Sequence, residues 1–139
     1  MSTTPLPAKG KTGGPPPIQV LLVDDSAVIR GLITRTLESD PDISVVASVG
    51  NGSLAVAAVA RHAPEVVVLD IEMPVMDGLE FLKNLRALPG GDKPIIVFCT
   101  TENDMNHIQK AIEAGANEYI MKPFDSEIIQ TKFTQVGLL

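Results

Sequence analysis

Five short runs of apolar residues, rich in Val and Ile, alternate along the chain with longer stretches in which apolar residues recur every three or four positions. The runs are mostly continuous, as expected for strands that are buried on both faces of a sheet. This alternation restricts the fold more than any other feature of the sequence. We expect strands at Ile18–Val23, Ile43–Val49, Val66–Leu69, Ile95–Cys99 and Glu118–Met121.

The stretches between the runs have the spacing of helices that bury one face. Strands that alternate with such helices predict a parallel sheet with right-handed crossovers and helices on both faces. The expected fold class is α/β, a three-layer doubly wound (βα)5 sandwich. Ser53 and Asp125 are expected to cap the second and fifth helices, and Gly115 to follow the fourth. The apolar stripes are Val28, Ile29, Leu32, Ile33 and Leu37; Leu54, Ala58 and Val59; Leu79, Leu82 and Leu85; Met105, Ile108 and Ile112; and Ile128, Ile129, Phe133 and Val136.

Residues 1–17 differ in composition from the rest of the chain. They contain five of the 11 prolines, three of the 11 glycines and two of the 11 Lys and Arg residues, with no Asp or Glu. Such a segment buries too little apolar surface to offset the entropy of ordering, so we expect a flexible tail, followed by one domain over residues 18–139. Without the two lysines of the tail, the formal charge of −6 becomes −8 for the domain.

This acidic charge argues against electrostatic capture of nucleic acid or of an anionic membrane, since both need clustered Lys and Arg. One cysteine excludes an internal disulfide framework and a multi-cysteine zinc site. No window approaches the roughly 20 apolar residues of a membrane span, and the N-terminus lacks a secretory apolar region. We therefore expect a cytoplasmic protein with neither nucleic-acid nor membrane partners.

Polar residues directly follow four of the five expected strands. Asp24 and Asp25 follow the first strand, Asp70 the third, Thr100 the fourth and Lys122 the fifth. The carboxyl ends of parallel strands meet at one edge of a doubly wound sheet, where such folds bind ligands. Each residue alone has an ordinary explanation as a turn, a helix cap or a surface charge. Together, three carboxylates in a partly desolvated site repel one another strongly unless a cation is present.

Mg²⁺ suits this site because it prefers hard oxygen ligands and commonly bridges carboxylates to phosphate. Asp25 and Asp70 are expected as direct ligands, and Asp24 as a direct or water-mediated one. Lys122 would then supply a second positive charge to a phosphoryl oxygen, and Thr100 a hydrogen bond. The Asp70 carboxylate would act as the nucleophile and form an aspartyl phosphate. The residues therefore predict phosphoryl transfer onto Asp70.

Four motifs occur in the same region: Val-Leu-Leu-Val-Asp-Asp-Ser at 20–26, Val-Leu-Asp-Ile-Glu-Met-Pro-Val-Met-Asp-Gly at 68–78, Cys-Thr at 99–100 and Tyr-Ile-Met-Lys-Pro-Phe at 119–124. In this order and spacing they resemble the receiver domain of bacterial two-component response regulators. The resemblance extends from about Ile18 to the C-terminus. It implies a flavodoxin-like fold with the strand order 2-1-3-4-5.

By position, the resemblance implies that Asp70 accepts a phosphoryl group from a sensor histidine kinase. Asp24, Asp25 and the backbone carbonyl of Glu72 would form the Mg²⁺ site with Asp70. Lys122 would contact the phosphoryl oxygens, and its bond to the following proline would be cis.

Two further residues match switch positions of the family. Thr100 would be the hydroxyl that moves toward the phosphoryl group, and Tyr119 the aromatic residue that rotates inward behind it. The resemblance thus implies a signalling switch rather than an enzyme, a monomer when unphosphorylated. A downstream protein target would bind the face formed by the fourth helix, the fifth strand and the fifth helix, which includes His107, Gln109, Lys110 and Glu118.

The kind of receiver is less well defined. The first half, with Asp-Ser-Ala-Val-Ile-Arg at 25–30, is similar to the receivers of chemotaxis methylesterases, whereas the second half, with 98–103 and 133–139, is similar to stand-alone CheY-like proteins. Because the sequence ends just after the fifth expected helix, we expect output through protein contacts. A regulatory fragment of a larger protein, such as a methylesterase, is the alternative.

Two other classes of protein compete with a receiver. Asp70 and Glu72 faintly resemble the paired acids of aspartate-nucleophile phosphatases, but the second acid is Glu and no cap domain is visible in the sequence. A flavodoxin-like cofactor carrier would place its phosphate loop at Asp24 and Asp25, where carboxylates repel phosphate. We rank both below the receiver.

Overall fold

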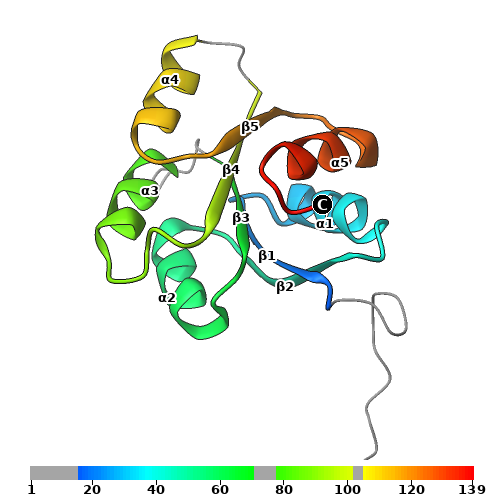
Figure 1. The fold of residues 1–139 in the computed structure, drawn as a ribbon, viewed down its shortest axis with the longest axis horizontal. Helices are drawn as coiled ribbons and strands as arrows, with labels where there is room; N and C mark the ends of the chain where they lie inside the picture. Colours follow the sequence, from blue (N-terminus) through cyan, green and yellow to red (C-terminus); the bar gives the residue numbers. More distant parts are fainter. Residues whose placement is uncertain (1–15, 71–77, 102–104) are drawn as a thin grey trace, which may run out of the picture.

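The computed structural model describes residues 16–70, 78–101 and 105–139, so the expected tail lies almost entirely outside the described residues. Five parallel strands form a single sheet in the order β2-β1-β3-β4-β5 (Figure 1). The predicted fold class and strand order are therefore confirmed. The strands are β1 (Ile18–Val23), β2 (Ile43–Val49), β3 (Val66–Asp70), β4 (Ile95–Thr100) and β5 (Glu118–Met121).

A helix follows each strand, and the helices form the two outer layers of the sandwich. In Figure 1, α1 and α5 lie on one side of the sheet, and α2, α3 and α4 lie on the other. This distribution agrees with right-handed crossovers between parallel strands. The helices are α1 (Ala27–Glu38), α2 (Gly52–His62), α3 (Gly78–Ala87), α4 (Met105–Glu113) and α5 (Ser126–Gln135).

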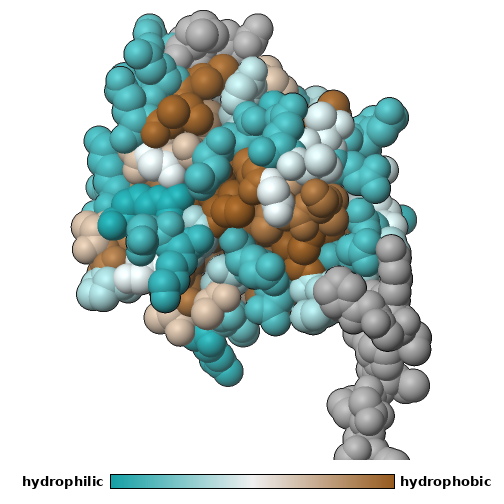
Figure 2. All heavy atoms as spheres, viewed as in Figure 1, coloured by the Kyte–Doolittle hydropathy of each residue, from teal (hydrophilic) through white to brown (hydrophobic). Residues whose placement is uncertain are grey.

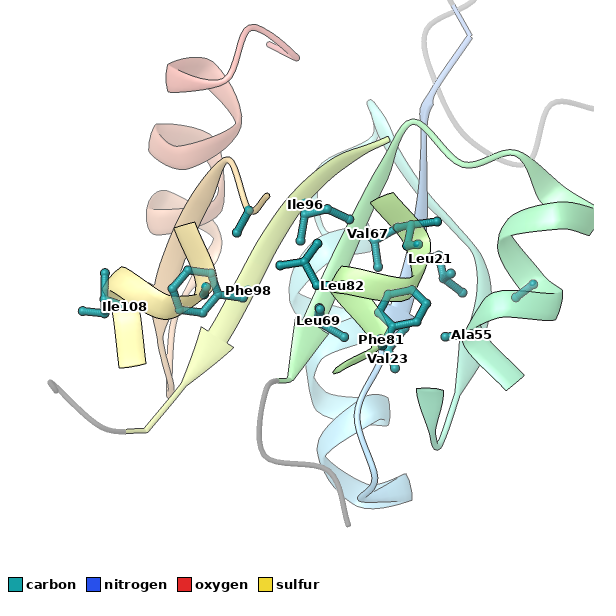
Figure 3. Packing of buried hydrophobic residues seen from close by; sticks show 14 residues of the cluster. Leu21, Val23, Ala55, Val67, Leu69, Phe81, Leu82, Ile96, Phe98 and Ile108 are labelled. Atoms are coloured by element: carbon teal, nitrogen blue, oxygen red, sulfur yellow. The ribbon is translucent and has the colours of Figure 1, made fainter. Parts of the chain in front are cut away.

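The side chains of the central strands alternate between two apolar cores, one on each face of the sheet. In β1, Leu21 and Val23 belong to the core under α2, α3 and α4, whereas Val20 and Leu22 belong to the core under α1 and α5. Figure 3 shows the first of these cores, where Phe81 of α3 packs among the strand side chains. Because both faces are covered, the central strands read in the sequence as continuous apolar runs.

Three helices begin at residues whose side chains cap them. Ser26 Oγ accepts a hydrogen bond from Ile29 N at 3.2 Å, and Asp125 Oδ1 accepts one from Ile128 N at 3.0 Å, which confirms Asp125 as a cap. The prediction of Ser53 as the cap of α2 is wrong. Asn51 is the cap, and its Oδ1 accepts from the N–H of the third residue after it at 2.9 Å. Serine and asparagine cap helices about equally well, so propensity alone did not separate them.

Parts of the predicted apolar stripes face solvent. In α1, Val28 is 73% exposed and Leu32 is 54% exposed, so only the later half of the predicted stripe is buried. In α2, Leu54 is 53% exposed and the buried positions are Ala55 and Ala58. The partly buried Val56 and Val59 also pack against this core, beside Ala55 and Ala58. On the face viewed in Figure 2, the larger areas of brown surface include one over α4 and one near the C-terminus.

Strands β3 and β4 each extend one residue beyond the predicted end, so Asp70 and Thr100 are the last residues of their strands. Gly115 follows α4 with a φ of +114°, a conformation that favours glycine, which confirms its predicted place. Within the part of the chain that the structure describes, no helix combines the length and the apolar character needed to cross a bilayer.

Candidate functional site

Two buried carboxylates lie at the carboxyl edge of the sheet, at the ends of neighbouring strands. Strands β1 and β3 are paired through Val23 and Leu69, so the next residues, Asp24 and Asp70, come side by side. Asp24 is 1% exposed and Asp70 is 5% exposed. Burial of two neighbouring carboxylates away from water is unfavourable unless positive charge lies nearby. The fold therefore brings together the ends of the first and third strands, in agreement with the strand order that the family resemblance implies.

Asp25 completes a group of three acids. It is exposed, and carboxylate oxygens of Asp24, Asp25 and Asp70 all lie within 4.8 Å of one another. Asp25 lies at the protein surface, whereas Asp24 and Asp70 are buried. All three predicted metal ligands that contribute a side chain are thus close enough to hold one ion.

Lys122 provides positive charge at this edge. Its Nζ lies 3.1 Å from Asp24 Oδ2, where it donates a hydrogen bond, and 3.7 Å from Asp70 Oδ2. Burial by itself lowers the pKa of this ammonium, but the Asp70 and Asp24 carboxylates more than compensate, and the pKa is raised. Lys122 therefore stays charged at neutral pH. Its bond to Pro123 is cis, as the resemblance implied.

Backbone contacts fix these groups at the ends of β1, β4 and β5. The N–H of Lys122 donates to the carbonyl of Thr100 at 2.8 Å, which joins the ends of β4 and β5. Asp24 Oδ1 accepts from Ser26 N at 3.0 Å, and the Asp24 carbonyl accepts from Arg30 Nη1 at 2.7 Å. Arg30 received no role from the sequence, because a basic residue in the first turns of a helix is usually solvated. Thr100 is fully buried beside the acids, at the end of the neighbouring strand.

The charges at the carboxyl edge do not balance within the described residues. The three carboxylates and the Lys122 ammonium, which contacts Asp24 and Asp70, have a formal sum of −2, and the Arg30 guanidinium adds positive charge only at the Asp24 backbone carbonyl. A divalent cation would neutralise this sum, and hard oxygen donors are the ligands that Mg²⁺ prefers. The residues present therefore fit the predicted metal. Glu72, whose carbonyl was predicted as a further ligand, lies outside the described residues.

The predicted switch aromatic, Tyr119, lies on β5 and is partly buried. It is paired in register with Phe98 of β4, and the two ring centroids are 5.9 Å apart. Lys132 of α5 places its Nζ 4.6 Å from the centroid of the Tyr119 ring. Sequence patterns do not predict this contact, because the two residues belong to different elements. Of the predicted output face, the side chain of His107 lies outside the described part.

Cys99 precedes Thr100 on β4 and is completely buried. Burial raises the pKa of its thiol to about 12. A thiol of this kind is protonated at neutral pH and unreactive.

Residues 20–134 match the family described as response regulator receiver domain. The chain is 50% identical over 114 residues to a protein-glutamate methylesterase/protein-glutamine glutaminase of Rhodospirillum centenum, an alignment that covers 82% of this chain and 29% of that protein. This chain belongs to the response regulator receiver family. It spans less than a third of the length of that relative.

Solved structures show the same fold. The chemotaxis protein CheY4 of Vibrio cholerae superposes with a TM-score of 0.78 at 31% identity, covering 88% of this chain and 99% of that one. The CheX–CheY–BeF3–Mg²⁺ complex of Borrelia burgdorferi contains a chain that matches with a TM-score of 0.80 at 25% identity, covering 87% and 90% respectively. The resemblance predicted from four sequence motifs is therefore confirmed.

Proposed function

We propose that this receiver accepts a phosphoryl group on Asp70 and uses it to switch a protein-binding surface. The observation that carries the proposal is the position of Asp70: a buried carboxylate at a strand end, close to Lys122 and within 4.8 Å of two further carboxylates. A histidine kinase is the proposed donor, as the family membership suggests. The protein acts as a regulatory switch in two-component signalling.

The residues have distinct roles in the transfer. An oxygen of Asp70 attacks the phosphorus of the donor phosphohistidine, the bond from phosphorus to the imidazole nitrogen breaks, and the imidazole leaves with the electron pair. Lys122 balances the negative charge of the incoming phosphoryl oxygens, and the Thr100 hydroxyl donates a hydrogen bond to one of them. Mg²⁺, held by Asp24, Asp25, Asp70 and the Glu72 carbonyl, would neutralise the remaining negative charge.

Phosphorylation then changes the balance between two conformations of the receiver. Thr100 moves toward the phosphoryl group and Tyr119 rotates inward behind it, which alters the face formed by α4, β5 and α5. Gln109, Lys110 and Glu118 lie on these elements. A partner protein that binds one of the two conformations more tightly would read the signal. We place this switch in the cytoplasm, within residues 18–139.

The methylesterase relatives favour one particular output. The chain is 50% identical to a part of one of them, and it covers 29% of that protein. We propose a methylesterase domain as a candidate for the regulated partner, either joined to this receiver or separate from it. A receiver that acts alone on another protein remains the other reading.

Phosphorylation can be tested by intact-mass spectrometry after incubation with acetyl phosphate and Mg²⁺. We expect wild-type protein to gain the mass of one phosphoryl group, and both Asp70→Asn and wild type in EDTA to gain none. Asp92→Asn removes an exposed acid at the opposite end of the sheet and should gain the same mass as wild type. Equal uptake by Asp70→Asn and wild type would overturn the proposal.

A further inference from the structure

Tyr119 is held from two neighbouring elements. Its ring lies 5.9 Å from that of Phe98 on β4, and Lys132 in the last turns of α5 places Nζ 4.6 Å from its centroid. Its backbone N–H donates to Glu118 Oε1 at 2.8 Å. An ammonium over a tyrosine ring is attracted to the negative face of the ring. The orientation of the Tyr119 ring is therefore coupled to the position of one lysine.

Lys132 is itself fixed by a second contact. Its Nζ lies 3.3 Å from Glu118 Oε1, the same oxygen that accepts from the Tyr119 N–H. The side chains of Lys132 and Glu118 are 21% and 20% exposed, so both are partly desolvated. One carboxylate oxygen thus connects the backbone of Tyr119 to the cation that contacts its ring. A Tyr119 ring that turned away would lose the cation, because Glu118 and the helix hold Lys132 in place.

We propose that Lys132 is a positioning residue that stabilises the Tyr119 orientation seen here and so opposes the inward rotation that accompanies phosphorylation. The inference rests on the proposed function, in which Tyr119 rotates. It adds a residue of α5 to a switch otherwise formed by β4 and β5. Lys122 and Lys132 then have different roles: Lys122 binds the phosphoryl group, and Lys132 stabilises the Tyr119 orientation that its contacts define.

A merely structural role for Lys132 predicts a different behaviour. A partly exposed ion pair contributes little to stability, and its loss would affect both conformations equally. A contact made in only one conformation changes the equilibrium between the two, and by linkage it changes the affinity for any ligand that prefers the other. The affinity for a phosphoryl mimic therefore separates the two roles.

Beryllofluoride with Mg²⁺ is a suitable mimic of the phosphoryl group. The chain has one Tyr and no Trp, so its intrinsic fluorescence reports on Tyr119 alone. Wild type, Lys132→Met, Lys132→Gln and Lys132→Arg are titrated with beryllofluoride while tyrosine emission is followed. Lys132→Met keeps most of the aliphatic stem and removes the charge, whereas Lys132→Arg keeps a cation that can lie over the ring. Lys83→Met, at an exposed position of α3, makes the same change of charge elsewhere.

We expect Lys132→Met and Lys132→Gln to bind beryllofluoride about two- to five-fold more tightly than wild type, the range given by a cation–π contact at a partly exposed site. Lys132→Arg and Lys83→Met should bind as wild type does. Unchanged or weaker binding by Lys132→Met and Lys132→Gln would overturn the inference while leaving the proposed function intact. Failure of wild type to bind beryllofluoride at all would instead contradict the proposed function.

The contact itself can be examined without a mimic. In wild type, the ring current of Tyr119 should shift the ε-methylene proton resonances of Lys132 upfield in the NMR spectrum, and Tyr119→Leu should return them to ordinary values. Addition of beryllofluoride to wild type should reduce the shift as the ring rotates. Resonances that are the same in wild type and in Tyr119→Leu would contradict the inference.

Discussion

The two edges of the sheet accommodate charge in opposite ways. At the amino edge, the Arg86 guanidinium donates five hydrogen bonds of 2.8 to 3.1 Å to three backbone carbonyls and the Asn117 side chain. At the carboxyl edge, three carboxylates crowd within 4.8 Å of one another and Lys122 contacts two of them. The first arrangement pairs a charge with neutral acceptors, whereas the second places like charges together.

The two edges differ in whether the protein itself supplies the partners of its charged side chains. Burial lowers the pKa of Arg86 and the nearby Asp92 carboxylate raises it, with a net lowering, yet every acceptor the guanidinium needs is supplied by the protein. At the carboxyl edge, the side chains of Asp24, Asp25, Asp70 and Lys122 have a formal sum of −2, which a divalent cation would balance. The amino edge supplies the acceptors for its own charged group, whereas the carboxyl edge holds a cluster of the hard oxygen donors that a divalent cation prefers.

The largest effect is expected at the amino edge. Arg86→Met removes five charge-assisted hydrogen bonds and leaves the loops before β4 and β5 without their common donor. The free energy of unfolding should fall by about 2–4 kcal/mol in urea denaturation, equally in Mg²⁺ and in EDTA. Arg61→Met, at an exposed position of α2, should change it little. A loss that Mg²⁺ reverses would break the distinction between the edges.

At the carboxyl edge, the cost of removing a charge should depend on the metal. Lys122→Met leaves Asp24 and Asp70 without their ammonium, so the free energy of unfolding in EDTA should fall by about 1–3 kcal/mol. Saturating Mg²⁺ should restore most of the loss, because a divalent cation balances the same carboxylates. Denaturation in the two buffers measures the difference. An equal loss in both would show that Lys122 is only structural.

A smaller loss of stability is expected from the close packing of Arg86 against Gly115. Gly115 and Gly90 both have positive φ, so alanine at either position carries backbone strain. A Cβ at Gly115 would also lie 2.8 Å from Arg86 Cγ, whereas nothing lies within 4 Å of a Cβ at Gly90. Gly115→Ala should therefore destabilise the protein by about 1 kcal/mol more than Gly90→Ala. Equal losses in thermal or urea unfolding would indicate that Arg86 shifts freely.

The two edges of the sheet also differ in how far the sequence predicts their residues. The carboxyl edge was predictable because its residues directly follow buried strands, and the order of strands decides which ends meet. Asp24, Asp70 and Lys122 were placed together on that basis, and the structure brings them together. The sequence does not identify Arg86, because four of its five hydrogen bonds go to backbone carbonyls, which carry no signal in the sequence, and Asn117 is distant along the chain.

Sequence patterns likewise do not predict the contacts between side chains of different helices and strands. Lys132 and Tyr119 are close only because α5 packs beside β5, and neither periodicity nor spacing predicts that pair. The cap of α2 was assigned to Ser53 instead of Asn51, since both residue types cap well and the choice depends on backbone geometry. Local rules therefore predict the elements, the family resemblance implies the order of the strands, and the contacts between side chains become visible only in the fold.

The most direct test of the account measures the stability of wild type and Asp70→Asn in EDTA and in saturating Mg²⁺. We expect Mg²⁺ to stabilise wild type, by about 2.7 kcal/mol at a hundred times its dissociation constant. Asp70→Asn reduces the repulsion among the acids, so it should be at least as stable as wild type in EDTA and gain much less from Mg²⁺. A wild type that gains nothing from Mg²⁺, or an Asp70→Asn that gains as much, would contradict a carboxyl edge built around a divalent cation.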